Sequence, residues 1–233
     1  MTPELALYSA AVCPYAQRTH LLLLEKGVPY ETVEIDLKNK SAEFLAISPY
    51  SKVPVIKRGP DVVWESSVIN EYLDEIYPNP PMMPSEPGRR ALARVWIDFA
   101  NVKLLPTWYR LFLAQEPVRQ AFLADELTSH FLFMEQAGIA ALSPSGPFWL
   151  GEHLSLVDLT YWPWFERLGA LKHYRKLGLP PECRRLRDWM KVMSARDSVL
   201  AIARPTEFYI SGYASYADGS EQGVTARDMR TGQ

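Results

Sequence analysis

A proline-rich stretch at residues 77–88 divides the sequence into two parts with different hydrophobic patterns. Five of its twelve residues are prolines, which break both helices and strands. Before it, short alternating runs of strand type are interleaved with helical segments, and after it apolar residues recur almost throughout at helical spacing. The chain has 233 residues, 48% of them hydrophobic, which is enough for two domains. We predict an α/β domain at 1–77, a linker at 78–88, an all-α domain at 89–204 and a C-terminal tail at 205–233.

The first part has the element order βαβ-α-ββα. Leu5 to Ser9 alternates like a strand, Pro14 to Lys26 carries an apolar helical face, and residues 30–35 alternate strictly. Because a helix joins these two strands, we expect them to be parallel, with a right-handed crossover. The further elements expected are a short helix capped by Ser41, strands at 52–56 and 62–64 paired as an antiparallel hairpin, and a helix at 65–76.

The second part is predicted to be all-α. Pro106 and Pro117 should kink or divide its helices, and residues 143–147 form a clear break. Ser155 and Asp158 have the spacing of a capping box, which stabilises a helix start by about 0.5–2 kcal/mol and needs no ligand. We therefore interpret Asp158 as structural. The helices expected span residues 89–114, 118–142, 156–170 and 182–194.

The tail is rich in Gly, Ser, Asp and Thr but also contains several aromatic residues. We expect residues 205–216 to dock on the body of the protein through these aromatic side chains. The end beyond Ala217 is expected to be loose.

Charge and cysteine content exclude several classes of function. With 25 basic and 27 acidic residues the net charge is −2, and no basic cluster is long enough to follow a phosphate backbone, so nucleic acid is not expected as a partner. No apolar segment approaches the roughly 20 residues of a membrane span, and the N-terminus lacks a signal-peptide pattern. Cys13 and Cys183 have no metal-ligand spacing, so no metal is expected. A cytoplasmic, reducing environment is the simpler interpretation, and a disulfide between the two cysteines is the alternative.

The stretch at residues 13–16, Cys-Pro-Tyr-Ala, lies between the first strand and the first helix. Pro14 suits the first helical position, which makes Cys13 the N-cap residue. A helix N-terminus stabilises a thiolate and lowers the pKa of its thiol from about 8.5 to about 3.5–7.5. Cys13 is therefore predicted to be a nucleophile, the alternative being an inert cysteine packed beneath a loop.

A thiol at this position in such a domain resembles the thioredoxin arrangement, with one departure. A dithiol oxidoreductase would carry a second cysteine at position 16, where this chain has Ala16. A mixed disulfide on Cys13 then needs an external thiol for its resolution. This indicates a small thiol cosubstrate bound beside Cys13.

Two further positions could hold a peptide-like thiol. If the Val53-Pro54 bond is cis, the backbone of Val53 is free to pair with an extended ligand as an added strand does; the alternative is a proline that merely begins a strand. Lys40 could reach a carboxylate, although a lysine in a loop more often faces solvent.

Residues 65–67, Glu-Ser-Ser, stand at a predicted helix start. A hydroxyl and the helix N–H groups suit a carboxylate, and Glu65 beside them suits an ammonium group. Helix capping by Ser66 or Ser67 and a solvated Glu65 explain the same residues equally well. Together with Cys13 and Lys40, these groups suit a zwitterionic tripeptide.

These motifs resemble those of cytosolic glutathione transferases of the cysteine type, closest to the omega class. The match is detailed over the first 77 residues and looser in the all-α part. It implies a thioredoxin-like domain followed by a helical domain, a mixed disulfide of glutathione on Cys13, and a homodimer. Tyr15 replaces the Phe usual in omega-like motifs, which leaves the sulfur unaffected. The residues at glutathione-binding positions are Tyr15, Lys40, Val53, Pro54, Glu65 and Ser66.

The resemblance implies thiol transfer and reductive deglutathionylation, with dehydroascorbate reduction or thioether cleavage as related reactions. The expected partners are glutathione as cosubstrate and either a hydrophobic or aromatic small molecule or a glutathionylated thiol. One alternative is a non-catalytic binding or regulatory protein on the same fold. Another is a glutathione-conjugating transferase in which a hydroxyl such as that of Tyr8 or Ser9 activates glutathione.

The architecture of this family implies that the electrophile binds between the domains, near Cys13. Aromatic residues at helical spacing are more often core than ligand site, so about half of the candidates should be buried structure. An aromatic-rich cleft would suit bulky planar substrates. The candidates are Trp96, Phe99, Trp108, Tyr109, Trp162 and Phe165.

Overall fold

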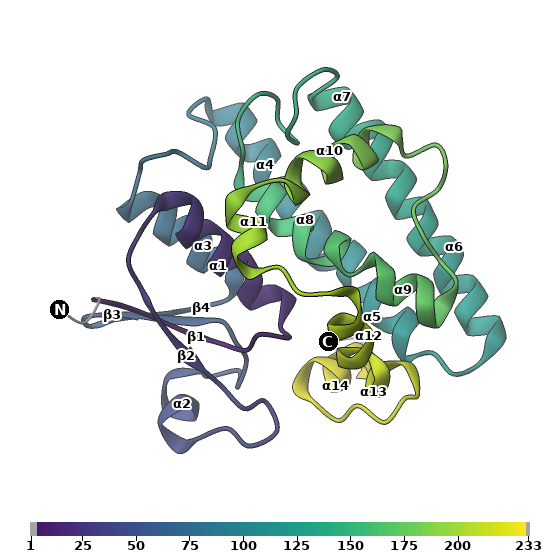
Figure 1. Ribbon diagram of the computed structural model, residues 1–233, viewed down its shortest axis with the longest axis horizontal. Coiled ribbons are helices and arrows are strands. Elements are labelled where there is room, and N and C mark those ends of the chain that lie inside the picture. The colour runs from purple at the N-terminus through teal and green to yellow at the C-terminus, as the bar shows by residue number, and fades with distance from the viewer. Residues whose placement is uncertain (1–3, 232–233) are drawn as a thin grey trace. The chain divides into compact units, whose positions relative to one another are not determined.

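The computed structural model describes residues 4–231, and by its contacts the chain divides into two units between Met83 and Pro84 (Figure 1). The outer ends of the predicted first domain and tail, 1–3 and 232–233, lie outside the described residues. None of the helices between residues 4 and 231 combines the length and hydrophobicity that a membrane crossing requires.

A four-stranded mixed sheet forms the centre of the first unit. β1 pairs with β2 in parallel and with β3 antiparallel, and β3 pairs with β4 antiparallel, which gives the order β2-β1-β3-β4. The predicted parallel pair and the predicted hairpin are thus confirmed. The strands are β1 (Leu5–Ser9), β2 (Glu31–Glu34), β3 (Val55–Arg58) and β4 (Asp61–Trp64).

Three helices accompany this sheet: α1 (Pro14–Lys26), α2 (Ala42–Ile47) and α3 (Ser66–Ile76). α1 and α3 contact each other on one side of the sheet, and α2 lies on the other side (Figure 1). Apolar residues at strand and helix spacing account for this packing, because they place one face of each element in the core. The fully buried members include Leu5, Leu7, Leu21, Leu22, Ile69 and Leu73.

The local signals at the element ends act as predicted, with one shift. Gly27 ends α1 in the left-handed conformation with φ 61°, and the Ser41 hydroxyl accepts the Phe44 N–H at 3.2 Å. The third strand, however, begins at Val55 rather than at residue 52. Pro54 has no N–H for the ladder, so regular pairing starts only after it.

The beginning of the proline-rich stretch is bound to the first unit by a buried lysine. The Lys26 ammonium donates to the Asp74 carboxylate at 2.7 Å and to the carbonyls of Tyr77 and Pro80 at 2.7 and 2.8 Å. Asp74 also accepts the Met82 N–H at 2.9 Å. These bonds hold the chain up to Met82 against α1 and α3, which explains why the contacts divide after Met83.

Replacement of Lys26 by Met should lower the free energy of unfolding by about 3 kcal/mol, because Asp74 would keep a buried charge without its partner. Lys191→Met is the matched control, since Lys191 pairs with Asp188 at a similar 2.8 Å while 77% and 55% of the two side chains are exposed. The control should leave urea denaturation nearly unchanged. Equal effects of the two substitutions would contradict the anchoring role.

The second unit is all-α, as predicted. Its elements are α4 (Pro87–Phe99), η1 (Ala100–Leu104), α5 (Leu105–Leu113), α6 (Pro117–Phe133), η2 (Met134–Ile139), α7 (Ala140–Leu142), α8 (Leu156–Glu166), α9 (Leu168–Arg175), α10 (Arg184–Ser194), α11 (Asp197–Ile202), α12 (Thr206–Gly212), α13 (Ala214–Ala217) and α14 (Val224–Thr231).

The two prolines predicted to disturb the helices act in different ways. Pro106 follows η1, a π-helical turn that lets the chain pass from α4 to α5 without a break; the wider turn accommodates the missing N–H and the proline ring. Pro117 simply begins α6, where its missing N–H costs nothing. The second π-helical turn, η2, contains Gly138, whose added Cβ would lie 2.9 Å from the Trp149 ring. Close packing against Trp149 therefore requires glycine there.

The capping box at the start of α8 is confirmed, and its acid is fully buried. The Asp158 carboxylate accepts the Ser155 N–H at 2.9 Å, the Trp149 N–H at 2.8 Å and the Trp189 indole N–H at 2.9 Å. Burial raises the pKa of the Asp158 carboxyl, and these hydrogen bonds oppose that rise. Asp158 joins the start of α8 to α10 and to the loop before α8, which is a structural role.

Asp158→Ala should lower the free energy of unfolding by roughly 3 kcal/mol or more, because it leaves the buried N–H donors of Trp149 and Trp189 without an acceptor. Ser155→Ala removes a cap and the 2.7 Å hydrogen bond from its hydroxyl to Asp158, and it should cost about 1–2 kcal/mol because the two tryptophan donors keep their acceptor. Urea denaturation followed by tryptophan fluorescence measures both. A larger loss for Ser155→Ala would contradict this account.

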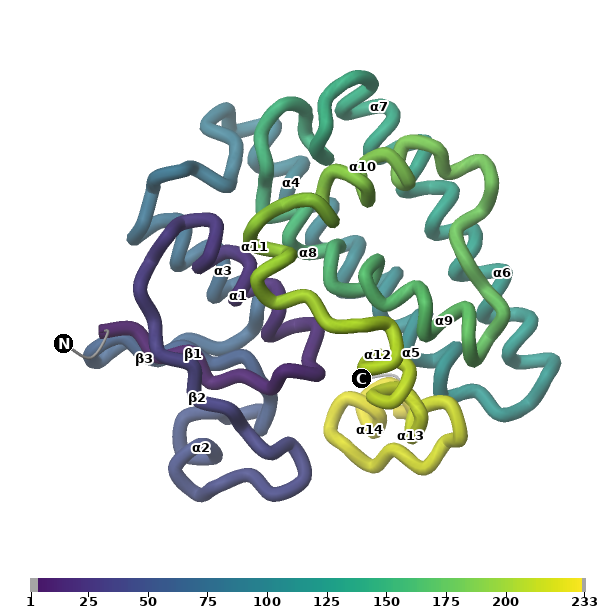
Figure 2. The backbone as a smooth tube through the Cα atoms, in the orientation of Figure 1, coloured from purple at the N-terminus to yellow at the C-terminus, as the bar shows by residue number. Residues whose placement is uncertain are grey.

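The C-terminal segment is ordered well beyond the expected point (Figure 2). Residues 205–216 dock as predicted, with Tyr213 buried and its ring centroid 4.4 Å from that of Phe112. The expectation of a loose end beyond Ala217 is wrong for the described residues, because α14 packs on α5 with Ala226 fully buried. A single small apolar residue in a polar segment is a weak sequence signal.

Candidate functional site

Four chain segments meet at one edge of the sheet in the first unit. β1 and β2 end together, with Ser9 opposite Glu34, and β3 begins at that edge, with Val55 opposite Tyr8. β4 ends there too, since Trp64 pairs with Val55. The loops at this edge therefore carry the residues that the sequence singled out: Cys13 after β1, Lys40 after β2, Val53 and Pro54 before β3, and Glu65 and Ser66 after β4.

Cys13 is the N-cap residue of α1, as predicted. Its backbone is extended, with φ −81° and ψ 116°, and Pro14 occupies the first helical turn. The Cys13 N–H donates to the Ala10 carbonyl at 2.8 Å, which fixes the turn that leads from β1 into the helix. The thiol is partly exposed and lies 3.7 Å from the Val53 carbonyl oxygen. The sulfur is thus held at the helix start and remains accessible.

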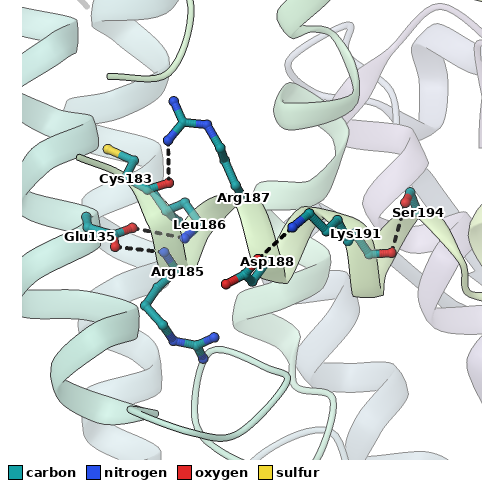
Figure 3. Close-up of polar contacts among 8 residues, drawn as sticks. All are labelled: Glu135, Cys183, Arg185, Leu186, Arg187, Asp188, Lys191 and Ser194. Carbon is teal, nitrogen blue, oxygen red and sulfur yellow. Dashed lines mark hydrogen bonds and ion pairs between the residues drawn. The ribbon is translucent and has the colours of Figure 1, made fainter. Parts of the chain in front are cut away.

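The other cysteine has the same position on a helix and a different environment (Figure 3). Cys183 is the N-cap residue of α10 and is fully buried. The Glu135 carboxylate occupies this helix start, accepting the N–H groups of Arg185 and Leu186 at 2.8 and 2.9 Å. Burial, and then the negative charge of Glu135, raise the pKa of the Cys183 thiol to about 11. Cys183 is therefore inert at neutral pH.

Both cysteines are free thiols, so the alternative of a long-range disulfide between Cys13 and Cys183 is wrong. Of the two, only Cys13 is partly exposed. Within residues 4–231 there is no cluster of three or more His, Cys, Asp or Glu side chains that could hold a metal ion.

Val53 and Pro54 are buried beside the sulfur, and the peptide bond between them is cis, the geometry that the sequence argument required. Val53 belongs to a buried cluster that also contains Phe44, and the Cys13 side chain packs against this cluster. The Val53 backbone thus approaches the nucleophile from the β3 side of the edge.

Glu65 and Ser66 begin α3. Glu65 is the N-cap residue, exposed and in the left-handed region with φ 69°. This conformation is uncommon for a residue other than glycine, and such strain concentrates at functional sites. Ser66 is the first helical residue and is buried. Capping by Ser66 or Ser67, the alternative interpretation, does not describe this helix, whose cap position is occupied by Glu65.

Arg18, which the sequence motifs do not single out, belongs to this site, and it is only 1% exposed. Its guanidinium donates from Nη1 to the Ser66 Oγ at 3.1 Å, and its carbon Cζ lies 5.2 Å from the centroid of the Tyr15 ring. Arg18 thereby connects the helix of Cys13 to the start of α3. A signal was present, because Arg18 precedes Leu21 and Leu22 by three and four residues and so lies on the buried face of α1.

Two predicted glutathione-binding residues remain, and both are half-buried. Tyr15 is half-buried in the first turn of α1, beneath Arg18. Lys40 is half-buried in the loop between β2 and α2. This loop leaves the sheet at the same edge as the loop that carries Cys13.

Of the two hydroxyl groups considered as alternative activators, that of Ser9 is engaged elsewhere. Ser9 is 1% exposed, and its Oγ lies 3.0 Å from the Nε2 of His20, whose Nδ1 is 3.1 Å from the Tyr30 hydroxyl. Burial lowers the pKa of His20 to about 4, so its ring is neutral at physiological pH. The Tyr8 ring packs on Phe44, with 6.2 Å between the centroids. Ser9 in particular is not accessible to a bound thiol.

Most of the aromatic candidates for the electrophile site belong to the helical core. Trp96 packs on Trp149 and Trp162 on Trp189, with ring centroids 5.4 and 6.0 Å apart. This favours the interpretation of aromatic residues at helical spacing as core. Phe99 alone is half-buried, and the buried candidates, each 1–4% exposed, are Trp96, Trp108, Tyr109, Trp162 and Phe165.

Two family models match this chain. The glutathione S-transferase N-terminal domain matches residues 7–81, and the glutathione S-transferase C-terminal domain matches residues 121–191. The glutathione S-transferase omega-1 of Sus scrofa is 32% identical over 197 residues, which cover 84% of this chain and 79% of the pig protein.

Solved structures agree with this assignment. Glutathione transferase Omega 3C from Trametes versicolor superposes with a TM-score of 0.83 at 31% identity, covering 94% of this chain and 92% of the fungal one. The dehydroascorbate reductase of Chlamydomonas reinhardtii gives a TM-score of 0.75 at 27% identity, covering 91% and 98%. The resemblance seen in the sequence motifs is confirmed: the chain belongs to the glutathione S-transferase family and is similar to its omega-class members.

Proposed function

We propose that this protein is a glutathione-dependent thiol transferase that works through a mixed disulfide on Cys13. The observation that carries the proposal is the position of Cys13, a partly exposed cysteine at a helix N-terminus with the Val53 carbonyl 3.7 Å away. A helix start favours the thiolate, which is the reactive form in disulfide exchange. The buried Cys183 offers no competing nucleophile.

In the first step the Cys13 thiolate attacks the glutathionyl sulfur of a glutathionylated substrate. A disulfide forms between Cys13 and glutathione, the substrate's disulfide breaks, and the substrate leaves as a thiolate that takes a proton from water. In the second step the thiolate of free glutathione attacks the glutathionyl sulfur on Cys13. Oxidised glutathione leaves and the Cys13 thiolate is regenerated.

The second step depends on external glutathione because the chain offers no resolving thiol. Ala16 occupies the position of a second cysteine, and Cys183 is buried with a pKa raised to about 11. In this proposal glutathione lies as an extended peptide beside Val53 and Pro54. Its amino-acid end meets the start of α3 at Glu65 and Ser66, and Lys40 and Tyr15 complete the site.

Dehydroascorbate, the substrate named for the Chlamydomonas neighbour, is proposed as a second substrate. The Cys13 thiolate adds to one of its carbonyl carbons, and a glutathione thiolate then attacks the Cys13 sulfur, so that the C–S bond breaks, ascorbate leaves and the mixed disulfide remains for the second glutathione. The reduction of dehydroascorbate also takes two electrons, which two molecules of glutathione supply as they form one disulfide. A cytoplasmic location accompanies the proposal, because both cysteines are free and the cycle consumes reduced glutathione.

Cys13→Ser should reduce turnover of a glutathionylated peptide to below about 1% of wild type, because a hydroxyl is not nucleophilic enough at neutral pH. Cys183→Ser is the control and should retain most of the activity. Mass spectrometry after exposure to oxidised glutathione should detect one glutathionyl adduct in wild type and in Cys183→Ser, and none in Cys13→Ser. A wild-type protein that never acquires the adduct would refute the mechanism.

The same variants test the alternatives. Conjugation of a chloronitrobenzene that survives or rises in Cys13→Ser would favour a conjugating transferase. Glutathione binding without turnover of either substrate by the wild-type protein would favour a binding or regulatory module.

We also propose that the protein forms a homodimer through exposed apolar side chains carried by both units. On the second unit Val95, Phe99 and Val102 follow one another at spacings of four and three residues, and Phe133 packs on Phe99 with 5.2 Å between ring centroids. Val95, Val102 and Phe133 are 48–58% exposed. A two-fold dimer that covers such a surface removes it from water.

The first unit carries a second surface of this kind. Tyr50 and Val68 are both 56% exposed, and Trp64 contacts Tyr50 with 6.5 Å between ring centroids. In a two-fold dimer, the apolar surface on the first unit of each copy would contact the apolar surface on the second unit of its partner. This contact would occur twice, which doubles the buried apolar area.

Val95→Glu should convert the dimer into a monomer, because the interface would then have to bury a charge. Val118→Glu introduces the same charge at an exposed valine outside the proposed surface and should leave the dimer intact. Light scattering coupled to size-exclusion chromatography measures the mass of each species. A monomeric wild type, or two variants with the same mass, would contradict this interface.

A further inference from the structure

Arg18 lies directly behind the hydroxyl that the proposed function places against glutathione. Its side chain is 1% exposed, and its Nη1 donates to the Ser66 Oγ at 3.1 Å. Ser66 is itself 5% exposed and is the first residue of α3. A buried guanidinium therefore contacts the first residue of α3.

The direction of this hydrogen bond determines what the Ser66 hydroxyl can do. A guanidinium has only donors, so Ser66 Oγ must be the acceptor. The single proton of the hydroxyl then points away from Arg18 and is available to an acceptor outside. The Ser66 hydroxyl is thus a hydrogen-bond donor at a helix start, where the backbone N–H groups also point toward an anion. Such a site suits a carboxylate and disfavours an ammonium group.

We propose that Arg18 is a positioning residue that makes Ser66 a hydrogen-bond donor to the α-carboxylate at the γ-glutamyl end of glutathione. The inference rests on the proposed function, and it adds the reason why a carboxylate is selected at this subsite. Arg18 keeps its charge at all physiological pH values, and a buried positive charge attracts an anion more strongly than an exposed one. The Tyr15 ring, 5.2 Å from the guanidinium carbon, covers this charge.

The backbone around Arg18 has contacts that do not depend on its side chain. The Asn70 side chain donates to the Arg18 carbonyl at 3.4 Å, and the Thr19 hydroxyl donates to the Asn70 Oδ1 at 2.9 Å. α1 therefore stays attached to α3 when the guanidinium is replaced. For this reason we expect substitutions at Arg18 to give a folded protein in which the ligand effect can be measured.

The experiment compares two ligands and three proteins by isothermal titration calorimetry. The ligands are glutathione and γ-aminobutyryl-cysteinyl-glycine, which differs from it only in lacking the α-carboxylate at the γ-glutamyl end and keeps the ammonium group. The proteins are wild type, Arg18→Met and Arg18→Lys. Wild type should bind glutathione at least about tenfold more tightly than the analogue, the preference expected of one charge-assisted hydrogen bond.

In Arg18→Met this preference should fall to about twofold or less, through weaker binding of glutathione and unchanged binding of the analogue. Arg18→Lys keeps a buried cation that can donate to Ser66, and it should restore part of the preference. In turnover assays the KM for glutathione should rise in Arg18→Met while kcat changes little, because Cys13 is untouched. Ser66→Ala should reduce the preference as Arg18→Met does, and the double variant should lose no more than either.

The outcomes separate the inference from the proposed function. An Arg18→Met protein that keeps the wild-type preference overturns the inference alone. If the substitution weakens the binding of both ligands equally and Arg18→Lys does not restore it, Arg18 has a purely structural role. That result also overturns the inference. A wild-type protein that binds neither ligand overturns the proposed function and the inference with it.

Discussion

The register of the four-stranded sheet is the constraint on which the candidate site depends. β1 and β2 end at the edge where β3 begins and β4 ends, so four loops that are distant in sequence come together. A shift of one residue between β1 and β3 would turn every side chain of the strand to the opposite face. The 3.7 Å approach of the Cys13 sulfur to the Val53 carbonyl is therefore a product of backbone pairing across the sheet.

Four helix N-termini of this protein have different roles, and the group that lies at each of them determines which role it has. At α10 the carboxylate of Glu135 satisfies the first N–H groups and suppresses the ionisation of Cys183. At α8 the buried Asp158 accepts the Ser155 N–H and joins this helix start to Trp189 of α10. At α1 the residue in this position is Cys13, which can itself carry the negative charge. At α3 the start of the helix is available, in our proposal, for the carboxylate of a ligand.

Much of the fold could be predicted from the sequence, because periodicity and capping residues act over a few positions. The βαβ unit, the hairpin, the helical second part and the cap at Ser155 all follow from such local patterns. The exceptions have local and distant causes. Pro54 delays the start of β3, and a π-helical turn absorbs Pro106. The order of the chain beyond Ala217 depends on the packing of α14 against α5, a contact between segments far apart in the sequence.

The sequence by itself determined the chemistry of the nucleophile: a cysteine before a proline at a helix start, with Ala16 in the place of a resolving cysteine. Only the tertiary structure decided which other groups take part. It buried Cys183, joined Ser9 to His20 in the core, and brought Arg18 to Ser66 across forty-eight positions of sequence. The physical reason is the range of the interactions. Helix starts and caps are set by neighbouring residues, whereas burial and side-chain pairing depend on which elements the sheet register brings into contact.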